Sequence, residues 1–278
     1  MANNPAKSGS GLSALVPRPL KRFLGMLRRA LIYRNYDSSA YWRKRTEAQG
    51  EARVLWRNEA YNRCYRRRQQ ELIEAFLPEI DREYRVLDIG CGVGTVAKML
   101  AQHPLIRIDA VDFPEMIAAA CRENSSPCIT YIASSAEDYF DSQKRYDLVL
   151  SSACFSAIRD ITSLRQAIRN CAAMTAPGGR MLMLDPFHRW NYLARSKFSS
   201  RQVIALMDSL GFTCIRKSGV LFWPYREWLA NSDMEKDALR TRFQNGEKWL
   251  GRLGKHLWAD YKILVFELPD NRHPGNHS

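Results

Sequence analysis

A glycine-rich turn between a strand-like run and a helix-like run is the feature that most restricts what this chain can fold into. Residues 85–97 have the sequence RVLDIGCGVGTVA, in which a short β-rich run ends at Ile89. Glycines follow at 90, 92 and 94, and the helical pattern TVAKMLAQH comes next. Glycine lets the backbone turn sharply and approach a ligand closely, and the first amides of the helix lack intrahelical partners. This order predicts an α/β domain that binds a ligand at the turn.

The charges near the turn indicate which kind of ligand it binds. Asp88 lies two residues before Gly90, where a carboxylate repels a phosphate and attracts a cationic or zwitterionic group. The turn also lacks the G-K-[ST] ending of a phosphate-binding loop. The next predicted strand, IRIDAVDF, places Asp112 22 residues after Gly90, where an acidic side chain accepts hydrogen bonds from ribose hydroxyls. Asp112 is also placed to cap the following helix, PEMIAAACREN, and the two roles are compatible.

These segments resemble a known family. VLDIGCGVGTVA followed by AVDFPEMI resembles the class I S-adenosylmethionine-dependent methyltransferases. The resemblance continues through ITYIASSAEDYF, YDLVLSSACFSAI and MTAPGGRMLMLDPF, and covers about residues 36–268. It implies an α/β fold with a doubly wound, Rossmann-like sheet of seven strands, the last of them antiparallel to its neighbours. It also implies S-adenosyl-L-methionine as the cofactor.

The resemblance further implies which residues bind the cofactor. Gly90 and Gly92 would surround its methionine part, and Asp88 would face its amino end. Asp112 would hold the ribose, with Phe113 against the adenine face. The backbone of Ala136 and the side chain of Glu137 would contact the adenine edge, and Ser151 would line the reactive side. The cofactor-binding candidates are therefore Asp88, Gly90, Gly92, Asp112, Phe113, Ala136, Glu137 and Ser151.

The candidates for the acceptor side come from two other segments. Tyr36, Tyr41 and Trp42, in the segment YDSSAYW, are candidates for a lid, in which Tyr36 and Tyr41 contact substrate, with core packing as the alternative. His188 closely follows the fifth strand and is the candidate general base, with a turn-capping loop histidine as the alternative. Arg189 would pair with an anionic group of the acceptor. Aromatic residues in the second half of the chain suit a large apolar acceptor and suit a hydrophobic core equally well.

The front of the chain is strongly basic. The formal net charge is +13, and the first 84 residues contain 17 basic and nine acidic side chains. Residues 20–32 place leucines and a phenylalanine at helical spacing among Lys and Arg, which predicts a basic amphipathic helix. This helix would contact an anionic membrane, pack on its own domain, act as a lid or belong to a transit peptide. A later segment combines aromatic and basic residues, Tyr61, Tyr65 and the arginines 66–68. It indicates either a nucleic-acid-binding surface or a helix with an aromatic core stripe and a solvated basic face, and we favour the second.

The expected organisation follows from these patterns. Residues 1–35 are a flexible tail with the basic helix, 36–84 a helical lid or cap in two segments, and 85–268 the methyltransferase domain. An insert at 224–259 separates the last two strands, which in this family usually form a compact hairpin, and 269–278 are a disordered tail. Seven cysteines without a C-x-x-C pair predict neither a disulfide framework nor a metal site. They favour a reduced, cytoplasmic location.

The predicted function is transfer of a methyl group from S-adenosyl-L-methionine to a small-molecule or lipid-like acceptor, with oxygen as the favoured acceptor atom. The alternatives are an RNA methyltransferase and a non-catalytic scaffold that keeps the fold. The chain lacks the N-P-P-Y-type loop of many base-methylating enzymes and any separate RNA-binding module, which counts against nucleic acid. We expect a cytoplasmic protein, with peripheral contact to the inner face of the membrane as a further prediction. The sequence does not indicate an oligomeric state.

Overall fold

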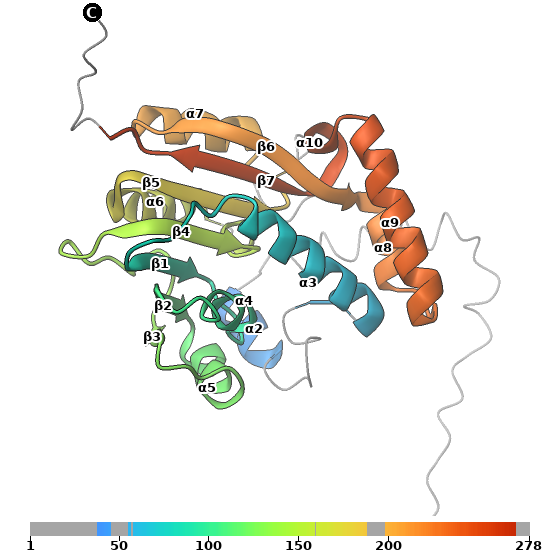
Figure 1. Ribbon diagram of the computed structural model, residues 1–278, viewed down its shortest axis with the longest axis horizontal. Coiled ribbons are helices and arrows are strands. Elements are labelled where there is room, and N and C mark those ends of the chain that lie inside the picture. Colours follow the sequence, from blue (N-terminus) through green and yellow to red (C-terminus); the bar gives the residue numbers. More distant parts are fainter. Residues whose placement is uncertain (1–37, 46–54, 57, 159, 188–197, 271–278) are drawn as a thin grey trace, which may run out of the picture. The chain divides into compact units, whose positions relative to one another are not determined.

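The computed structural model describes residues 38–45, 55–56, 58–158, 160–187 and 198–270 (Figure 1). Their strands form one sheet of seven in the order β3-β2-β1-β4-β5-β7-β6. The predictions for Tyr36, His188 and Arg189 lie outside the described residues, and so does the prediction of a basic helix at 20–32. Among the helices that are described, none combines the length and hydropathy that a membrane span requires.

The strand pairing confirms the doubly wound fold class. β1 (Tyr84–Ile89) pairs in parallel with β2 (Ile106–Asp112) on one side and β4 (Tyr146–Ser152) on the other. Parallel pairs also join β2 to β3 (Ile129–Ala133) and β4 to β5 (Thr175–Asp185). β7 (Ala259–Glu267) runs antiparallel between β5 and β6 (Thr213–Phe222), as the family resemblance implied. The strand order reverses at β1, so the carboxyl ends of β1, β2 and β4 flank the switch point where such sheets bind ligands.

The helices cover both faces of the sheet. One core cluster joins α3 (Glu59–Glu74), α4 (Thr95–Leu100), α8 (Trp223–Ala230) and α9 (Lys236–Arg252) to one set of strand residues. A second joins α6 (Ile161–Ala173) and α7 (Ser200–Ser209) to the alternate set. Val86 belongs to the first cluster and its neighbour Leu87 to the second, because successive side chains of a strand point to opposite faces. The remaining helices are α2 (Ser38–Arg45), α5 (Pro114–Glu123), the 3-10 turn η4 (Phe155–Ala157) and α10 (Lys255–Trp258).

The second front helix starts later than its sequence pattern predicts. The pattern predicts a helix from residue 51, but Leu55 and Trp56 are not helical and α3 begins at Glu59. Asn58 fixes this start, because its side-chain oxygen accepts a hydrogen bond from the amide of Tyr61 at 3.0 Å. The predicted aromatic stripe is confirmed, since Tyr61 and Tyr65 are 0% and 1% exposed. Helices α8, α9 and α10 lie between β6 and β7 in the chain, and α9 packs on α3.

Candidate functional site

The glycine turn after β1 forms the floor of a pocket at the carboxyl ends of β1, β2 and β4. Gly90, Gly92 and Gly94 all have positive φ, which other residues rarely adopt. The amides of Gly90 and Cys91 both donate to the carbonyl of Val111, at 2.8 and 3.0 Å, and so attach the turn to the end of β2. A Cβ atom at Gly90 would collide with the side chain of Cys154 from the loop after β4. Only glycine therefore lets the turn lie this close to the β4 loop.

Asp112 links the turn to the end of β2. One carboxylate oxygen accepts from the amide of Gly92 at 2.7 Å, and the other accepts from the amide of Phe113 at 2.7 Å. Burial raises the pKa of this carboxyl to about 6, although both amide bonds act to lower it. The second role predicted for Asp112, as the helix cap, is wrong, because Phe113 is the N-cap residue of α5 and Asp112 makes no capping bond to its first turn.

Asp88 lies beneath the turn rather than on the pocket surface. Its side chain is 1% exposed, and one of its carboxylate oxygens has no hydrogen-bond partner. Burial, and secondarily the charge of Asp112, raises its pKa to about 7, while Arg66 acts in the opposite direction. Burying a carboxyl without a hydrogen-bond partner costs free energy. A hydrogen-bond donor from a bound ligand or water would therefore stabilise this group.

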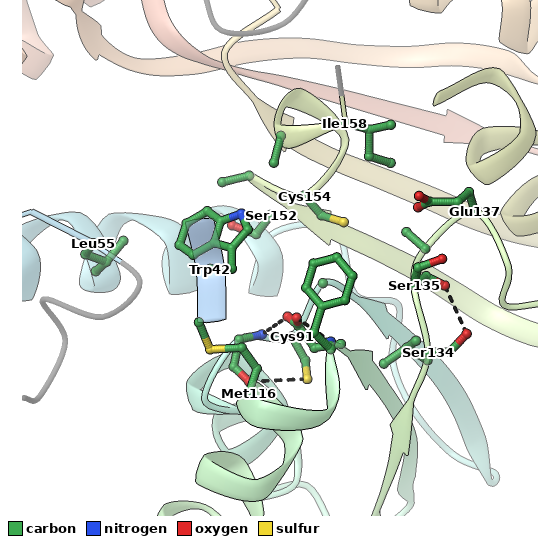
Figure 2. A pocket seen from close by; sticks show the side chains of 18 of the residues that line it. Trp42, Leu55, Cys91, Met116, Ser134, Ser135, Glu137, Ser152, Cys154 and Ile158 are labelled. Atoms are coloured by element: carbon green, nitrogen blue, oxygen red, sulfur yellow. Dashed lines mark hydrogen bonds between the residues drawn. The ribbon is translucent and has the colours of Figure 1, made fainter. Parts of the chain in front are cut away.

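The far wall of the pocket comes from the loop after β3. Figure 2 shows Glu137, Ser134 and Ser135 on one side of the pocket and Trp42 on the other. Ala136 and Phe113 also line it, so six of the predicted cofactor residues meet in one pocket: Gly90, Gly92, Asp112, Phe113, Ala136 and Glu137. Glu137 is held through its backbone, because Asn170 on α6 donates to its carbonyl oxygen at 2.9 Å.

Ser151 does not reach the pocket, although the family resemblance implies that it lines the reactive side. Its hydroxyl donates to the buried carboxyl of Asp185 on β5 at 3.2 Å, and that carboxyl also accepts from the amide of Ser156 at 2.9 Å. Burial raises the pKa of Asp185 to about 7. The next residue, Ser152, lines the pocket instead, because neighbouring strand side chains face opposite ways.

The helix α3 contributes a wall that sequence reasoning missed. Tyr65 and Arg66 line the pocket together with Tyr261 from β7. Arg66 donates to the side-chain oxygen of Gln69 at 2.8 Å, and Gln69 in turn donates to the hydroxyl of Ser152 at 2.5 Å. The prediction that Arg66 lies on a solvated basic face is therefore wrong. The helical spacing that places Tyr65 in the core gave no sign that its neighbour turns toward the end of β4.

The hydroxyl of Tyr65 is a second buried polar group without a partner. The ring packs edge-to-face against Trp56 and Tyr261, with centroids 5.0 and 5.4 Å apart. The hydroxyl itself makes no hydrogen bond, and burial raises the pKa of this phenol well above its usual value. Tyr65 therefore stays protonated and can donate a hydrogen bond.

The helix α2 presents Trp42, not Tyr41, to the pocket. Trp42 packs against the cluster formed by Val93, Met116 and Ala119 and lines the pocket beside the glycine turn. Tyr41 accepts a hydrogen bond from Arg45 at 3.0 Å and is not among the lining residues. In the described part of the chain, no three His, Cys, Asp or Glu side chains gather as metal ligands would.

Comparison with known proteins identifies the class. The chain matches the Methyltransferase domain family over residues 61–239, which is more than half of its length. With its seven-stranded sheet and glycine turn, the chain belongs to this family, as a class I S-adenosylmethionine-dependent methyltransferase. The family's cofactor is therefore S-adenosyl-L-methionine.

Curated relatives resemble parts of the chain. Malonyl-[acyl-carrier protein] O-methyltransferase 1 of Ilyobacter polytropus is 32% identical over 91 residues, which is 32% of this chain and 34% of that protein. Nodulation protein S of Rhizobium tropici is 28% identical over 57% of this chain and 63% of its own length. A ubiquinone biosynthesis O-methyltransferase of Coxiella burnetii is 29% identical over 34% of this chain and 41% of its own length. The matched segments thus span about one third to under two thirds of these relatives.

Solved structures share the fold. The N-methyltransferase NodS from Bradyrhizobium japonicum has a TM-score of 0.51 and 19% identity, over 75% of this chain and 98% of that one. The same protein in complex with S-adenosyl-L-homocysteine has a TM-score of 0.50 and 17% identity, over 76% of this chain and 100% of that one. At this level of identity the likeness shows the fold alone.

Proposed function

We propose that this chain transfers a methyl group from S-adenosyl-L-methionine to a small-molecule or lipid-linked acceptor, at oxygen. One observation carries the proposal: a single pocket joins the glycine turn and Asp112 on one side to Tyr65, Arg66 and Tyr261 on the other. The first set suits the cofactor and the second suits an acceptor. Methyl transfer requires these two ligands to meet in line.

The cofactor side fits its ligand in two ways. The unpartnered oxygen of Asp88 lies beneath the turn and can take a donor from the cofactor's ammonium group, directly or through water. The positive φ at Gly90 and Gly92 lets the turn fold back at the end of β1, so that its backbone lines the pocket where the methionine part would lie. Asp112 would hold the ribose, and Phe113, Ala136 and Glu137 would contact the adenine, because all four line the same pocket.

The acceptor side would orient and polarise the acceptor, and its side chains would not act as nucleophiles. When bound, S-adenosyl-L-methionine supplies an electrophilic methyl group, so the chain's task is to position the acceptor. Arg66 would bind an anionic group of the acceptor, while Gln69, which itself donates to Ser152, holds the guanidinium in place. Burial raises the pKa of the Cys154 thiol well above its usual value, so this pocket residue remains a neutral thiol. His188 stays our candidate base and Arg189 and Tyr36 our candidate acceptor contacts.

The acceptor class is supported by the relatives. Two of them are named as O-methyltransferases, one acting on a malonyl group carried by a protein and one in ubiquinone biosynthesis. The structural neighbour NodS is an N-methyltransferase, so nitrogen is the second candidate atom. An aromatic wall of Trp42, Tyr65 and Tyr261 favours an acceptor with a large apolar part. We further propose a cytoplasmic chain whose residues 20–32 contact the inner face of the membrane.

Calorimetric titration tests the proposal. The full chain should bind S-adenosyl-L-methionine and S-adenosyl-L-homocysteine in the micromolar range and should not bind NAD. Transfer of a labelled methyl group into a bacterial lipid extract then tests the acceptor, with His188→Gln as the variant that should retain cofactor binding and lose turnover. A chain that binds neither sulfur ligand would instead support the scaffold alternative.

A further inference from the structure

The most exposed apolar side chains of the described residues lie within ten positions of one another. Trp249, Leu253, Leu257 and Trp258 are 60%, 53%, 63% and 58% exposed. No other large apolar side chain in the described ranges exceeds the 51% of Phe140. We call residues 248–258, at the end of α9 and in α10, the α9–α10 elbow. Such a concentration of exposed indole and leucine side chains indicates an interaction surface.

The elbow has a defined backbone. Gly254, with φ of +80°, joins α9 to α10, and Leu250 is fully buried beneath the elbow. The ammonium group of Lys262 donates to the carbonyl of Leu257 at 3.1 Å and also to that of His256. The apolar side chains are therefore exposed from an ordered part of the fold.

The charged side chains within the elbow are all basic. Lys248, Arg252 and Lys255 lie in the elbow, and no carboxylate occurs between residues 248 and 258. Lys248 and Lys255 also line a groove between α3 and α9, which we call the basic groove. The further cations of this groove include Arg63, Arg67, Lys236 and Arg240.

The acidic residues of the basic groove are already engaged. Glu247 pairs with Arg68 at 3.1 Å and accepts from the amide of Leu221 at 2.7 Å. Glu71 pairs with the same arginine at 2.9 Å. Within the described part of the chain, Arg67, Lys236, Lys248 and Lys255 make no ion pair. The groove and the elbow thus present one continuous cationic surface beside exposed indoles.

We propose that the α9–α10 elbow and the basic groove form a docking surface for an anionic lipid bilayer. Tryptophan and leucine side chains bury favourably at the boundary of headgroups and acyl chains, and Lys and Arg attract anionic lipid phosphates. A nucleic acid would match the charge but leave Leu253 and Leu257 in water. Figure 1 shows α9 and α10 at the end of the sheet toward which the β1 and β4 arrows point. Docking therefore brings the end of the sheet that carries the pocket toward the lipid. The docking proposal does not depend on the proposed methyl transfer.

Vesicle co-sedimentation of the full chain tests the proposal. The chain should bind vesicles of equal phosphatidylglycerol and phosphatidylcholine, and should bind phosphatidylcholine alone at least about 10-fold more weakly. A combined Trp249→Ser, Leu253→Ser, Leu257→Ser, Trp258→Ser variant should lose at least about 10-fold in affinity for the anionic vesicles. The matched control is Phe140→Ser with Ile215→Ser, two exposed apolar residues outside the surface. It should bind like the unaltered chain.

Two further measurements separate the elbow from other contacts. A Leu24→Ser, Leu27→Ser variant removes apolar residues of the 20–32 segment. It should retain the part of the affinity for anionic vesicles that the elbow contributes. In the unaltered chain, vesicle binding should shift the tryptophan fluorescence to shorter wavelength. The Trp249→Phe, Trp258→Phe variant should retain vesicle binding but lose most of this shift. The elbow variant should bind cofactor with the same affinity as the unaltered chain. This result would show that the variant is folded.

Three outcomes would overturn the proposal. The first is an unaltered chain that ignores anionic vesicles, and the second is an elbow variant that binds them as strongly as the unaltered chain. The third is a chain that is dimeric by light scattering, becomes monomeric in the elbow variant and binds no vesicles. That result would assign the surface to a second copy of the chain.

Discussion

The two sides of the pocket are built in different ways. The side that we propose for the cofactor consists of two adjacent strand ends, with Gly90, Gly92 and Asp112 within 22 positions of one another. The side that we propose for the acceptor combines Trp42 from α2, Tyr65 and Arg66 from α3 and Tyr261 from β7, which are far apart in the sequence. A local motif fixes the first side, and only packing of distant elements creates the second. Changes on the two sides should therefore affect different measurements.

The largest effect is expected at Gly90, whose lack of a Cβ atom lets the glycine turn lie close to the loop after β4. Gly90→Ala places a Cβ against Cys154 at a positive φ, so strain and overpacking should together lower the free energy of unfolding by about 2 to 4 kcal/mol. Denaturant titration measures this loss, and cofactor binding should fall with it. Gly251→Ala is the matched control, because that glycine is helical and meets only the end of Lys255 at 3.5 Å. An equal loss in both variants would contradict the tight approach at Gly90.

The next largest effect concerns affinity alone. Asp112→Asn replaces one acceptor with an amide donor facing the backbone donors of Gly92 and Phe113, and removes the charge offered to the ribose. Affinity for S-adenosyl-L-homocysteine should fall about 100-fold, roughly 2.7 kcal/mol, by calorimetry. Asp138→Asn is the control, since Asp138 is exposed and does not itself line the pocket, although it bonds to Ser135, which does. Unchanged affinity in Asp112→Asn would remove Asp112 from the site.

On the acceptor side the effect should appear in turnover and not in cofactor binding. Tyr65→Phe removes a hydroxyl that has no partner, so stability should hold or rise slightly while turnover falls about 10-fold. Tyr61→Phe removes an equally unpartnered, fully buried hydroxyl on the same helix that does not line the pocket, so its turnover should stay unchanged. Equal turnover in both variants would show that Tyr65 serves the core only.

The smallest effect, counted for a pH change of one, is a pH dependence from the buried carboxyl under the turn. The folded-state pKa of Asp88 is about 7 and its ordinary value is 3.8, so between these two values the folded chain keeps a proton that the unfolded chain loses. Asp88 therefore lowers the free energy of unfolding as pH rises from about 4 to about 7, by at most about 1.4 kcal/mol for each pH step of one. Denaturant titration across this pH range measures the decline. Asp88→Asn should flatten it without removing it, because burial raises the pKa of Asp185 to about 7 as well.

The same carboxyl should couple pH to cofactor affinity. A bound ammonium group favours the ionised form of Asp88, so binding below about pH 7 should release a proton and affinity should rise between pH 6 and 8. Calorimetry in buffers of different ionisation enthalpy measures the released proton. A chain that binds cofactor with no proton release at pH 6 would place Asp88 outside the binding site.

Sequence reasoning named residues that share one pocket, but it failed where side-chain direction mattered. Six predicted residues meet in the pocket because short-range geometry connects them: a strand, a turn and the next strand end. Ser151 bonds to Asp185 and its neighbour Ser152 lines the pocket, since a strand alternates its faces and the sequence did not say which face the pocket uses. Of the two lid candidates on α2, Trp42 lines the pocket and Tyr41 does not, for the corresponding reason on a helix.

The sequence by itself determined the α/β class, the glycine turn and the acidic residue at the second strand end, because hydrophobic periodicity and glycine's freedom at positive φ act locally. Only the tertiary structure decided that Arg66 faces the pocket and that Asp88 and Tyr65 keep unpartnered polar atoms. It also decided that indoles of the α9–α10 elbow stay exposed. Burial and hydrogen-bond partnering depend on which distant segments pack together, and no local pattern encodes that choice.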